Sequence, residues 1–122
     1  MPHLILEYSA NLASYLNPPA LFQALHEALL ATGAFQLADL KSRAVRLDEF
    51  CVGDGDPRHA FVHLRIAVLE GRAPELQQRI GEVLLEALAA ELDEAQRHFA
   101  CQLCVELQEL RRDLYFKRGP AD

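Results

Sequence analysis

The first residue that could do chemistry is Pro2, which directly follows Met1. Methionine is usually removed before a small residue, and its removal here would leave the secondary amine of proline as the chain terminus. Residues 3–8 have the apolar and β-branched character of a strand, so the strand begins at once. An amine in apolar surroundings loses solvation of its charged form, and its pKa falls towards neutrality. Such an amine could act as a general base beside a carbonyl compound.

Three cationic residues are candidates for an anion site. Arg72 follows a predicted strand and precedes a predicted helix, where N-terminal amides favour anions. Its guanidinium could hold a carboxylate through two parallel hydrogen bonds. Lys41 and Arg43 are two residues apart on a predicted strand, so they point to the same face. Alternatively, Arg72 is a solvated arginine in a loop, and Lys41 and Arg43 are solvent-exposed residues of an edge strand, without a role in binding.

Cysteine and histidine residues give weaker signals. Cys101 and Cys104 form a C-x-x-C motif, but no second pair accompanies it. Three-residue spacing on a strand points the two thiols to opposite faces, so we expect no metal site and no cofactor. Cys51 makes the set odd, without the pattern of a secreted disulfide protein. For His3 and His63, which could line a pocket, a hydrogen-bonded structural role is the favoured interpretation.

The first half of the chain predicts a β-α-β unit that would position these residues. After the strand at 3–8, Asn17 is the expected N-cap of a helix whose first turn contains two prolines. Gly33 stands where a C-terminal cap would, and residues 37–47 are extended in character. Apolar residues recur at helical spacing between these limits, at Leu21, Phe22, Leu25, Ala28 and Leu29.

The second half predicts the same order of elements after the turn-forming segment 53–57. Residues 60–68 read as a strand, 74–92 as a helix and 101–107 as a final strand. One apolar stripe runs along the helix, through Leu76, Ile80, Val83, Leu84, Ala87 and Leu88. We therefore expect a single domain over 1–122, with halves at about 1–52 and 58–117.

Two such units predict an α+β fold, in which a four-stranded sheet carries two helices on one face. Each right-handed β-α-β crossover makes its two strands parallel and places the helix against the sheet. The other face of the sheet is then left without a cover. Because the strands are rich in apolar residues, we expect this face to be buried in an oligomer. The residues behind this expectation are Leu4, Leu6, Val62, Leu64 and Ile66.

Bulk composition excludes several classes of function. The 122 residues are 51% hydrophobic and 25% charged, as in an ordinary globular domain. The formal net charge of -6, without a basic block, argues against nucleic acid as a partner but leaves room for a local cationic pocket. No apolar run reaches the roughly 20 residues of a membrane helix, and the N-terminus lacks the basic region of a signal peptide. We expect a cytoplasmic protein.

Four segments, in order, resemble the 5-carboxymethyl-2-hydroxymuconate isomerase family of the tautomerase superfamily, to which 4-oxalocrotonate tautomerase and macrophage migration inhibitory factor also belong. They are MPHLILEYSANL at 1–12, ATGAFQLADLKSR at 31–43, AFVHLRI at 60–66, and Gly71-Arg72. The likeness runs from Met1 to about Lys117. It implies a homotrimer of β-α-β repeats that catalyses a 1,3-proton shift without a cofactor. The implied substrate is an unsaturated polycarboxylate, a small-molecule dienol in the homoprotocatechuate branch of 4-hydroxyphenylacetate degradation.

The resemblance also implies roles for the candidate residues. Pro2 would be the catalytic base and Arg72 a functional arginine, with Lys41 and Arg43 completing the substrate-binding anion pocket. The family pattern has arginine at the position of Lys41. Lysine keeps the charge but loses the planar, two-pronged geometry, so this departure bears on substrate identity and efficiency.

Two other interpretations stay open. One is a tautomerase-fold decarboxylase or dehalogenase, which would use the same proline to activate water. The other is a non-catalytic oligomerisation or ligand-sensing module in which Pro2 is incidental. A retained Met1 would make catalysis by Pro2 impossible, so the mass of the intact protein separates this last interpretation from the other two.

Overall fold

The computed structural model describes residues 1–120, which form two β-α-β units in the predicted order. The first unit comprises β1 (His3–Ser9), α1 (Pro18–Ala31) and β2 (Lys41–Leu47). The second comprises β3 (His59–Leu69), α2 (Pro74–Glu91), a short helix α3 (Asp93–His98) and β4 (Ala100–Leu110). Three 3₁₀ turns lie at Ala10–Tyr15, Leu37–Asp39 and Arg112–Leu114.

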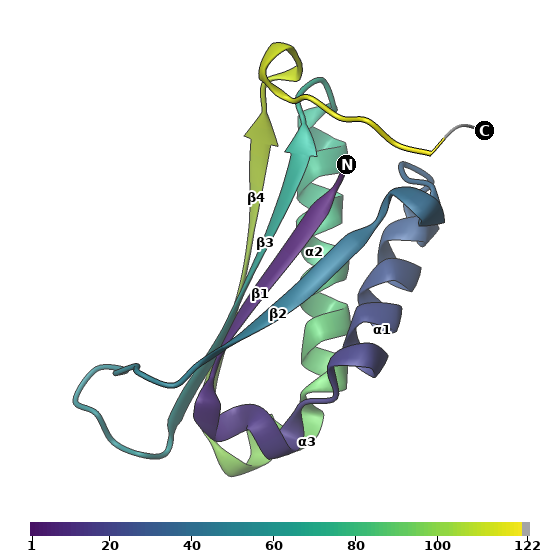
Figure 1. Cartoon of the computed structure of the whole chain (residues 1–122). Coiled ribbons are helices and arrows are strands. Elements are labelled where there is room, and N and C mark those ends of the chain that lie inside the picture. The colour runs from purple at the N-terminus through teal and green to yellow at the C-terminus, as the bar shows by residue number, and fades with distance from the viewer. Residues whose placement is uncertain (121–122) are drawn as a thin grey trace.

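The four strands form one sheet in the order β2-β1-β3-β4. Each unit contributes a parallel pair, and the central strands β1 and β3 join the units in antiparallel fashion. His3 pairs with Lys41 on one side and with Ala67 on the other. The start of β1, the start of β2 and the end of β3 therefore meet at one end of the sheet, where the N-terminus lies in Figure 1.

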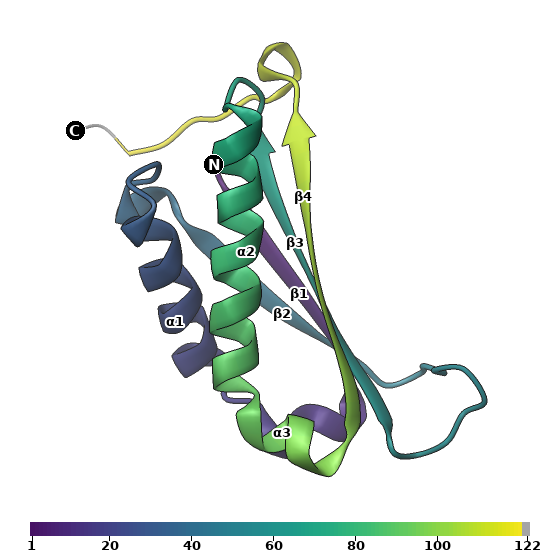
Figure 2. The same cartoon turned by 180° about the vertical axis from the view of Figure 1, so that it is seen from behind.

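Both long helices lie on the same face of the sheet, behind it in Figure 1 and in front of it in Figure 2. The core fills the space between the sheet and these helices, and its strand residues alternate with outward-facing ones. The predicted α+β architecture with two helices on one face is confirmed. Fully buried core side chains include Leu4, Leu6, Leu21, Leu25, Leu29, Leu64, Ile66, Ile80, Leu84 and Leu88.

Local signals set the limits of α1 as predicted. The Asn17 side chain accepts a hydrogen bond of 3.3 Å from the Ala20 amide, and prolines occupy the first turn. The helix ends at Ala31, and Gly33 follows with a φ of 76°, a conformation that glycine adopts without strain. The Gly33 amide donates to Leu30 O at 3.0 Å, which closes the last turn.

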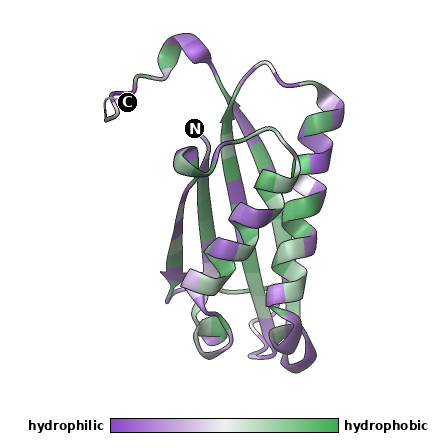
Figure 3. Ribbon diagram, turned by 90° about the vertical axis from the view of Figure 1, so that its right-hand side faces the viewer, coloured by the Kyte–Doolittle hydropathy of each residue, from purple (hydrophilic) through white to green (hydrophobic). Residues whose placement is uncertain are grey.

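The prediction of an apolar open face is wrong. Leu4, Leu6 and the three apolar residues named on β3 are at most 1% exposed, because they face the helices. The opposite face carries the alternate residues of each strand, so charged and apolar groups are mixed there, and hydrophilic bands interrupt the strands in Figure 3. The residues of this open face include Ile5, Glu7, Val45, Phe61, His63, Arg65, Cys104 and Glu106.

One boundary differs from the predictions. Residues 37–39 form a 3₁₀ turn rather than extended chain, so β2 begins at Lys41. The helix predicted to end at about Leu92 ends at Glu91, and Leu92 caps it with φ of -103° and ψ of 26°. The short α3 after it was not predicted. None of the helices formed by residues 1–120 combines the length and the apolar character that crossing a bilayer requires.

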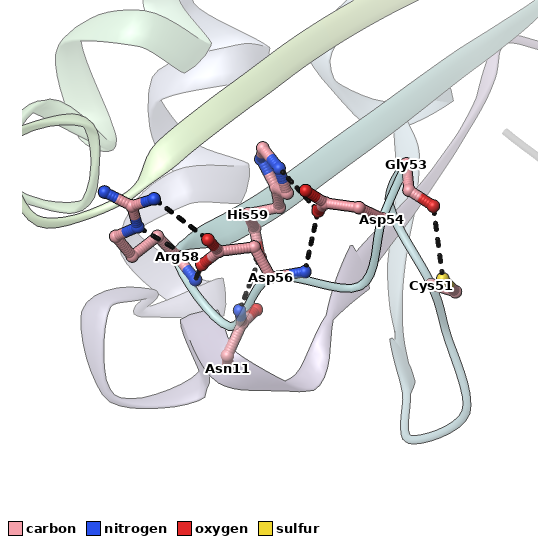
Figure 4. A network of polar contacts seen from close by, with 7 residues as sticks. All are labelled: Asn11, Cys51, Gly53, Asp54, Asp56, Arg58 and His59. Atoms are coloured by element: carbon pink, nitrogen blue, oxygen red, sulfur yellow. Dashed lines mark hydrogen bonds and ion pairs between the residues drawn. The ribbon is translucent and has the colours of Figure 1, made fainter.

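A polar network fixes the other end of the sheet, where the loop between β2 and β3 projects (Figure 4). Asp56 accepts hydrogen bonds from the backbone and the guanidinium of Arg58, which lower the pKa of its carboxyl to about 2. The side-chain amide of Asn11 donates to His59 O at 2.8 Å, and Asp54 lies 3.4 Å from the His59 ring. This loop is thus held apart from the end that carries Pro2.

Candidate functional site

Pro2 is buried at the head of β1, where its carbonyl accepts a hydrogen bond of 3.4 Å from the Lys41 amide. The terminal amine, here that of Met1, has a pKa below its usual value. Burial is the largest cause, followed by the positive charges of Lys41 and Lys117, while Asp39 opposes them. Removal of Met1 would place the amine on Pro2 itself, one residue deeper in this environment.

Lys41 lies beside the chain terminus, on the first residue of β2. Its ammonium donates a hydrogen bond of 2.7 Å to the backbone carbonyl of Asp39. The Asp39 carboxylate pairs instead with Lys117, which reaches it from the C-terminal segment at 3.7 Å. Among residues 1–120, the two lysines and the terminal amine therefore share this corner with the Asp39 carboxylate.

Arg43 is two residues further along β2, on the same face as Lys41, as predicted. The residue between them, Ser42, points the other way and hydrogen-bonds to His26 of α1 at 2.7 Å. Arg43 Nη1 lies 3.2 Å from His3 Nδ1, which belongs to the neighbouring strand. The favoured interpretation of His3 as a hydrogen-bonded residue is confirmed.

Arg72 sits in the connection from β3 to α2, at the same end of the sheet. Gly71 precedes it with a φ of 115°, which turns the chain sharply after the strand. Arg72 Nη1 donates to Leu69 O at 3.1 Å, and the guanidinium carbon lies 4.7 Å from the centre of the Phe35 ring. Burial, followed by the charge of Arg112, lowers the pKa of Arg72.

These cations share one property that matters for anion binding. Among residues 1–120, no carboxylate forms an ion pair with Lys41, Arg43 or Arg72. The three side chains bind a backbone carbonyl, an imidazole and an aromatic ring instead, so their charges are not neutralised. An anionic ligand at this end of the sheet could supply the missing negative charge.

The candidate residues therefore lie at one end of the sheet, on three segments: the N-terminus, β2 and the connection from β3 to α2. Sequence reasoning did not assign Phe35, Asp39, Tyr115 or Lys117 to this end. Phe35 and Asp39 lie within segment 31–43, which contributes to the family resemblance. That resemblance is the signal from which their position near the site could have been inferred. For Tyr115 and Lys117, only the return of the chain after β4 brings them to the N-terminus.

Pro2 and the three cations line neither of two cavities elsewhere in the molecule. One, of about 280 Å³, lies under the loop between β2 and β3, near Asn11 and His59. Another, of about 430 Å³, is beside α1, lined by His26, Leu30 and Leu37 among others.

The C-x-x-C motif is arranged as predicted from its spacing on a strand. Cys101 faces the core and is half-buried, which raises the pKa of its thiol. Cys104 is exposed on the open face. His63 on the same face lies 3.0 Å from Glu106 and 3.9 Å from Glu7.

A family model described as 5-carboxymethyl-2-hydroxymuconate isomerase matches residues 2–121. The chain is 34% identical over 119 residues to the 5-carboxymethyl-2-hydroxymuconate Delta-isomerase of Escherichia coli, covering 98% of this chain and 94% of that protein. It is also similar to a crystal structure of a 5-carboxymethyl-2-hydroxymuconate isomerase from Deinococcus radiodurans R1, with a TM-score of 0.89 and 32% identity over 98% of this chain and 90% of that one.

More distant structures share the fold alone. A fused 4-OT described as a wild-type symmetric trimer has a TM-score of 0.68 at 18% identity, over 90% of this chain and 86% of that one. A member of the cis-3-chloroacrylic acid dehalogenase family has a TM-score of 0.69 at 16% identity, over 95% and 81%.

Proposed function

This chain belongs to the 5-carboxymethyl-2-hydroxymuconate isomerase family, and we propose that it catalyses a 1,3-proton shift on 5-carboxymethyl-2-hydroxymuconate or a similar unsaturated polycarboxylate. The reaction is a keto–enol isomerisation in the degradation of 4-hydroxyphenylacetate. The observation that carries the proposal is the juxtaposition of a buried chain terminus with three cations that lack carboxylate partners. A small polyanion that loses and regains a proton fits both features.

In this proposal Pro2 is the general base after removal of Met1. Burial and the nearby lysines lower the pKa of the Met1 amine. We expect the same causes to act on the Pro2 amine once Met1 is removed, so that a larger fraction is unprotonated at neutral pH. The neutral amine takes a proton from the substrate and becomes a cation, while the substrate becomes a conjugated anion. The same ammonium then returns the proton at another atom of the conjugated system, so no cofactor is required.

The three cations bind the substrate and stabilise its negative charge. Lys41 and Arg43, on one strand face, bind substrate carboxylates. Arg72 stands where negative charge develops on the carbonyl oxygen, or holds a carboxylate next to it. Its contacts with Leu69 O and the Phe35 ring limit the freedom of the guanidinium before substrate arrives, which favours transition-state stabilisation.

The active assembly in this proposal is a homotrimer. One observation supports it: a structure with the same fold is described as a symmetric trimer. A neighbouring subunit at the Pro2 end would exclude water from the base. The mixed open face of the sheet would meet polar as well as apolar groups of a partner.

The test is a spectroscopic assay of processed, untagged protein with 5-carboxymethyl-2-hydroxymuconate, after mass spectrometry has shown that Met1 is absent. We expect turnover by this protein and none by a form that keeps an N-terminal extension, while circular dichroism of the two forms agrees. Failure of the processed protein to isomerise the substrate would refute the proposed substrate. Full activity of the extended form would place the base elsewhere.

A further inference from the structure

A row of three side chains links Arg43 to the C-terminal segment. Arg43 Nη1 lies 3.2 Å from His3 Nδ1, and His3 Nε2 lies 3.0 Å from the Tyr115 hydroxyl. The His3 and Tyr115 rings meet edge to face, with centres 6.1 Å apart and planes at 66°. Because Tyr115 follows β4, this row connects residues separated by almost the whole chain.

The chemistry of the three groups fixes where the protons are. A guanidinium can only donate hydrogen bonds, so His3 Nδ1 must accept from Arg43 and carries no proton. The proton of a neutral imidazole is then on Nε2, which donates it to the Tyr115 oxygen. A doubly protonated ring would turn Nδ1 into a donor and break the contact with Arg43.

The surroundings of His3 favour the neutral ring. Burial lowers the pKa of His3 most, followed by the charges of Arg43 and Lys41 from β2, of the terminal amine and of Lys117. The residue paired with His3 on β3 is Ala67, which does not titrate. Each of these four charged groups is a cation.

The segment that carries Tyr115 is fixed on both sides. Before it, the Arg112 amide donates to the Glu70 carboxylate at 2.8 Å, and Arg112 Nε donates to Glu70 O at 3.0 Å. After it, Lys117 pairs with Asp39 at 3.7 Å. In Figures 1 and 2 this segment runs from the end of β4 across the end of the sheet where the N-terminus lies.

We propose that His3 and Tyr115 are positioning residues for Arg43: Tyr115 holds the neutral imidazole in its Nε2–H form, and the imidazole orients the guanidinium towards a substrate carboxylate. This step rests on the proposed function for the identity of the substrate. Arg43 is exposed and lacks a carboxylate partner among residues 1–120, so its side chain would otherwise lose rotamer freedom on binding. Ordering it beforehand is worth about 2- to 10-fold in affinity.

The arrangement itself is tested without substrate, by nitrogen NMR of the His3 imidazole. We expect an unprotonated Nδ1, a protonated Nε2 and a pKa below 6.5, and Tyr115→Phe should reduce the preference for the Nε2–H form. A protonated Nδ1, or a pKa at or above 6.5, overturns the proposal. This measurement decides the arrangement even if the protein fails to turn over the muconate.

Kinetics then test the effect on Arg43. His3→Leu should raise KM about 3- to 10-fold with little change in kcat, as Arg43→Ala should, and the double variant should be no worse than Arg43→Ala alone. His3→Gln, which offers both an acceptor and a donor, should stay near wild type. Additive effects of His3→Leu and Arg43→Ala would overturn the proposal. His98→Gln, on exposed α3, is the matched control and should leave KM unchanged.

Discussion

Replacement of Arg72 by alanine is the most direct test of how the charge of this site is used. The guanidinium has five N–H donors, and the structure assigns one of its nitrogens to Leu69 O while the Phe35 ring lies against its carbon. The remaining donors are available to an oxyanion, and partial burial strengthens such a contact. Loss of one charge-assisted hydrogen bond costs about 1.5–3 kcal/mol, or roughly 10- to 150-fold in rate.

We expect this loss mainly in kcat, since in the proposed mechanism the proton shift creates negative charge that Arg72 would stabilise. Phe35→Leu should give a smaller loss of roughly 2- to 30-fold, because a cation–π contact is worth about 0.5–2 kcal/mol.

Steady-state kinetics with 5-carboxymethyl-2-hydroxymuconate measures both variants, with thermal unfolding to monitor the fold. Arg79→Ala, on the exposed side of α2, is the matched control. An increase in KM alone would refute a transition-state role, and equality with Arg79→Ala would remove Arg72 from the site.

Lys41→Arg restores the arginine of the family pattern, so muconate turnover should rise or stay level; a sharp fall would indicate a pocket built around lysine for another acid. Pro2→Ala supplies a primary amine, and we expect a large but incomplete loss of kcat in the same assay. Lys117→Met removes a cation that lowers the pKa of the Met1 amine. If Lys117 acts in the same way on the Pro2 amine, the acidic limb of the kcat/KM pH profile should move to higher pH, and an unchanged profile contradicts this. Light scattering should give about three times the 13.7 kDa chain mass, and a stable monomer would contradict the trimer.

Stability should also depend on pH through His3. Its folded-state pKa lies below the ordinary value of 6.5, so the unfolded chain binds more protons between the two values. The contribution of the neutral ring is complete above pH 6.5 and is lost as the pH falls through the folded-state value. Urea unfolding should therefore show a smaller loss of stability below pH 6.5 in His3→Gln than in wild type. Equal losses in both proteins would contradict this assignment.

Much of the fold could be predicted from local sequence because local chemistry decides it. Asn17 caps α1 through its own side chain, and Gly33 ends the helix through a conformation that other residues avoid. The same holds for the shared face of Lys41 and Arg43, which follows from the two-residue period of a strand. The apolar open face was predicted wrongly because Leu4 and its neighbours were taken without applying that period.

The other residues of the site could not be predicted, because they depend on long-range contacts that leave no local sequence pattern. Tyr115 reaches His3 across 112 positions, and Lys117 reaches Asp39 only because the chain folds back after β4. In the sequence, no helical or strand pattern follows the last predicted strand. The contact partner of each cation could not be predicted from the sequence either. Arg72 and Phe35, for example, lie on connections in different β-α-β units, and they come into contact only because the two units pack together.

The acidic character of the whole protein and the cationic character of this end are compatible because screening makes electrostatics local. At physiological ionic strength the Debye length is about 8 Å, so an anion near Pro2 responds mainly to Lys41, Arg43 and Arg72 rather than to the formal net charge of -6. Glu7 and Glu106, on the open face, lie next to His63 rather than next to these cations. A long polyanion such as nucleic acid would extend beyond this cluster into acidic surface and be repelled there. A small polycarboxylate fits within the cluster, which is how an acidic chain can select a short anion as its substrate.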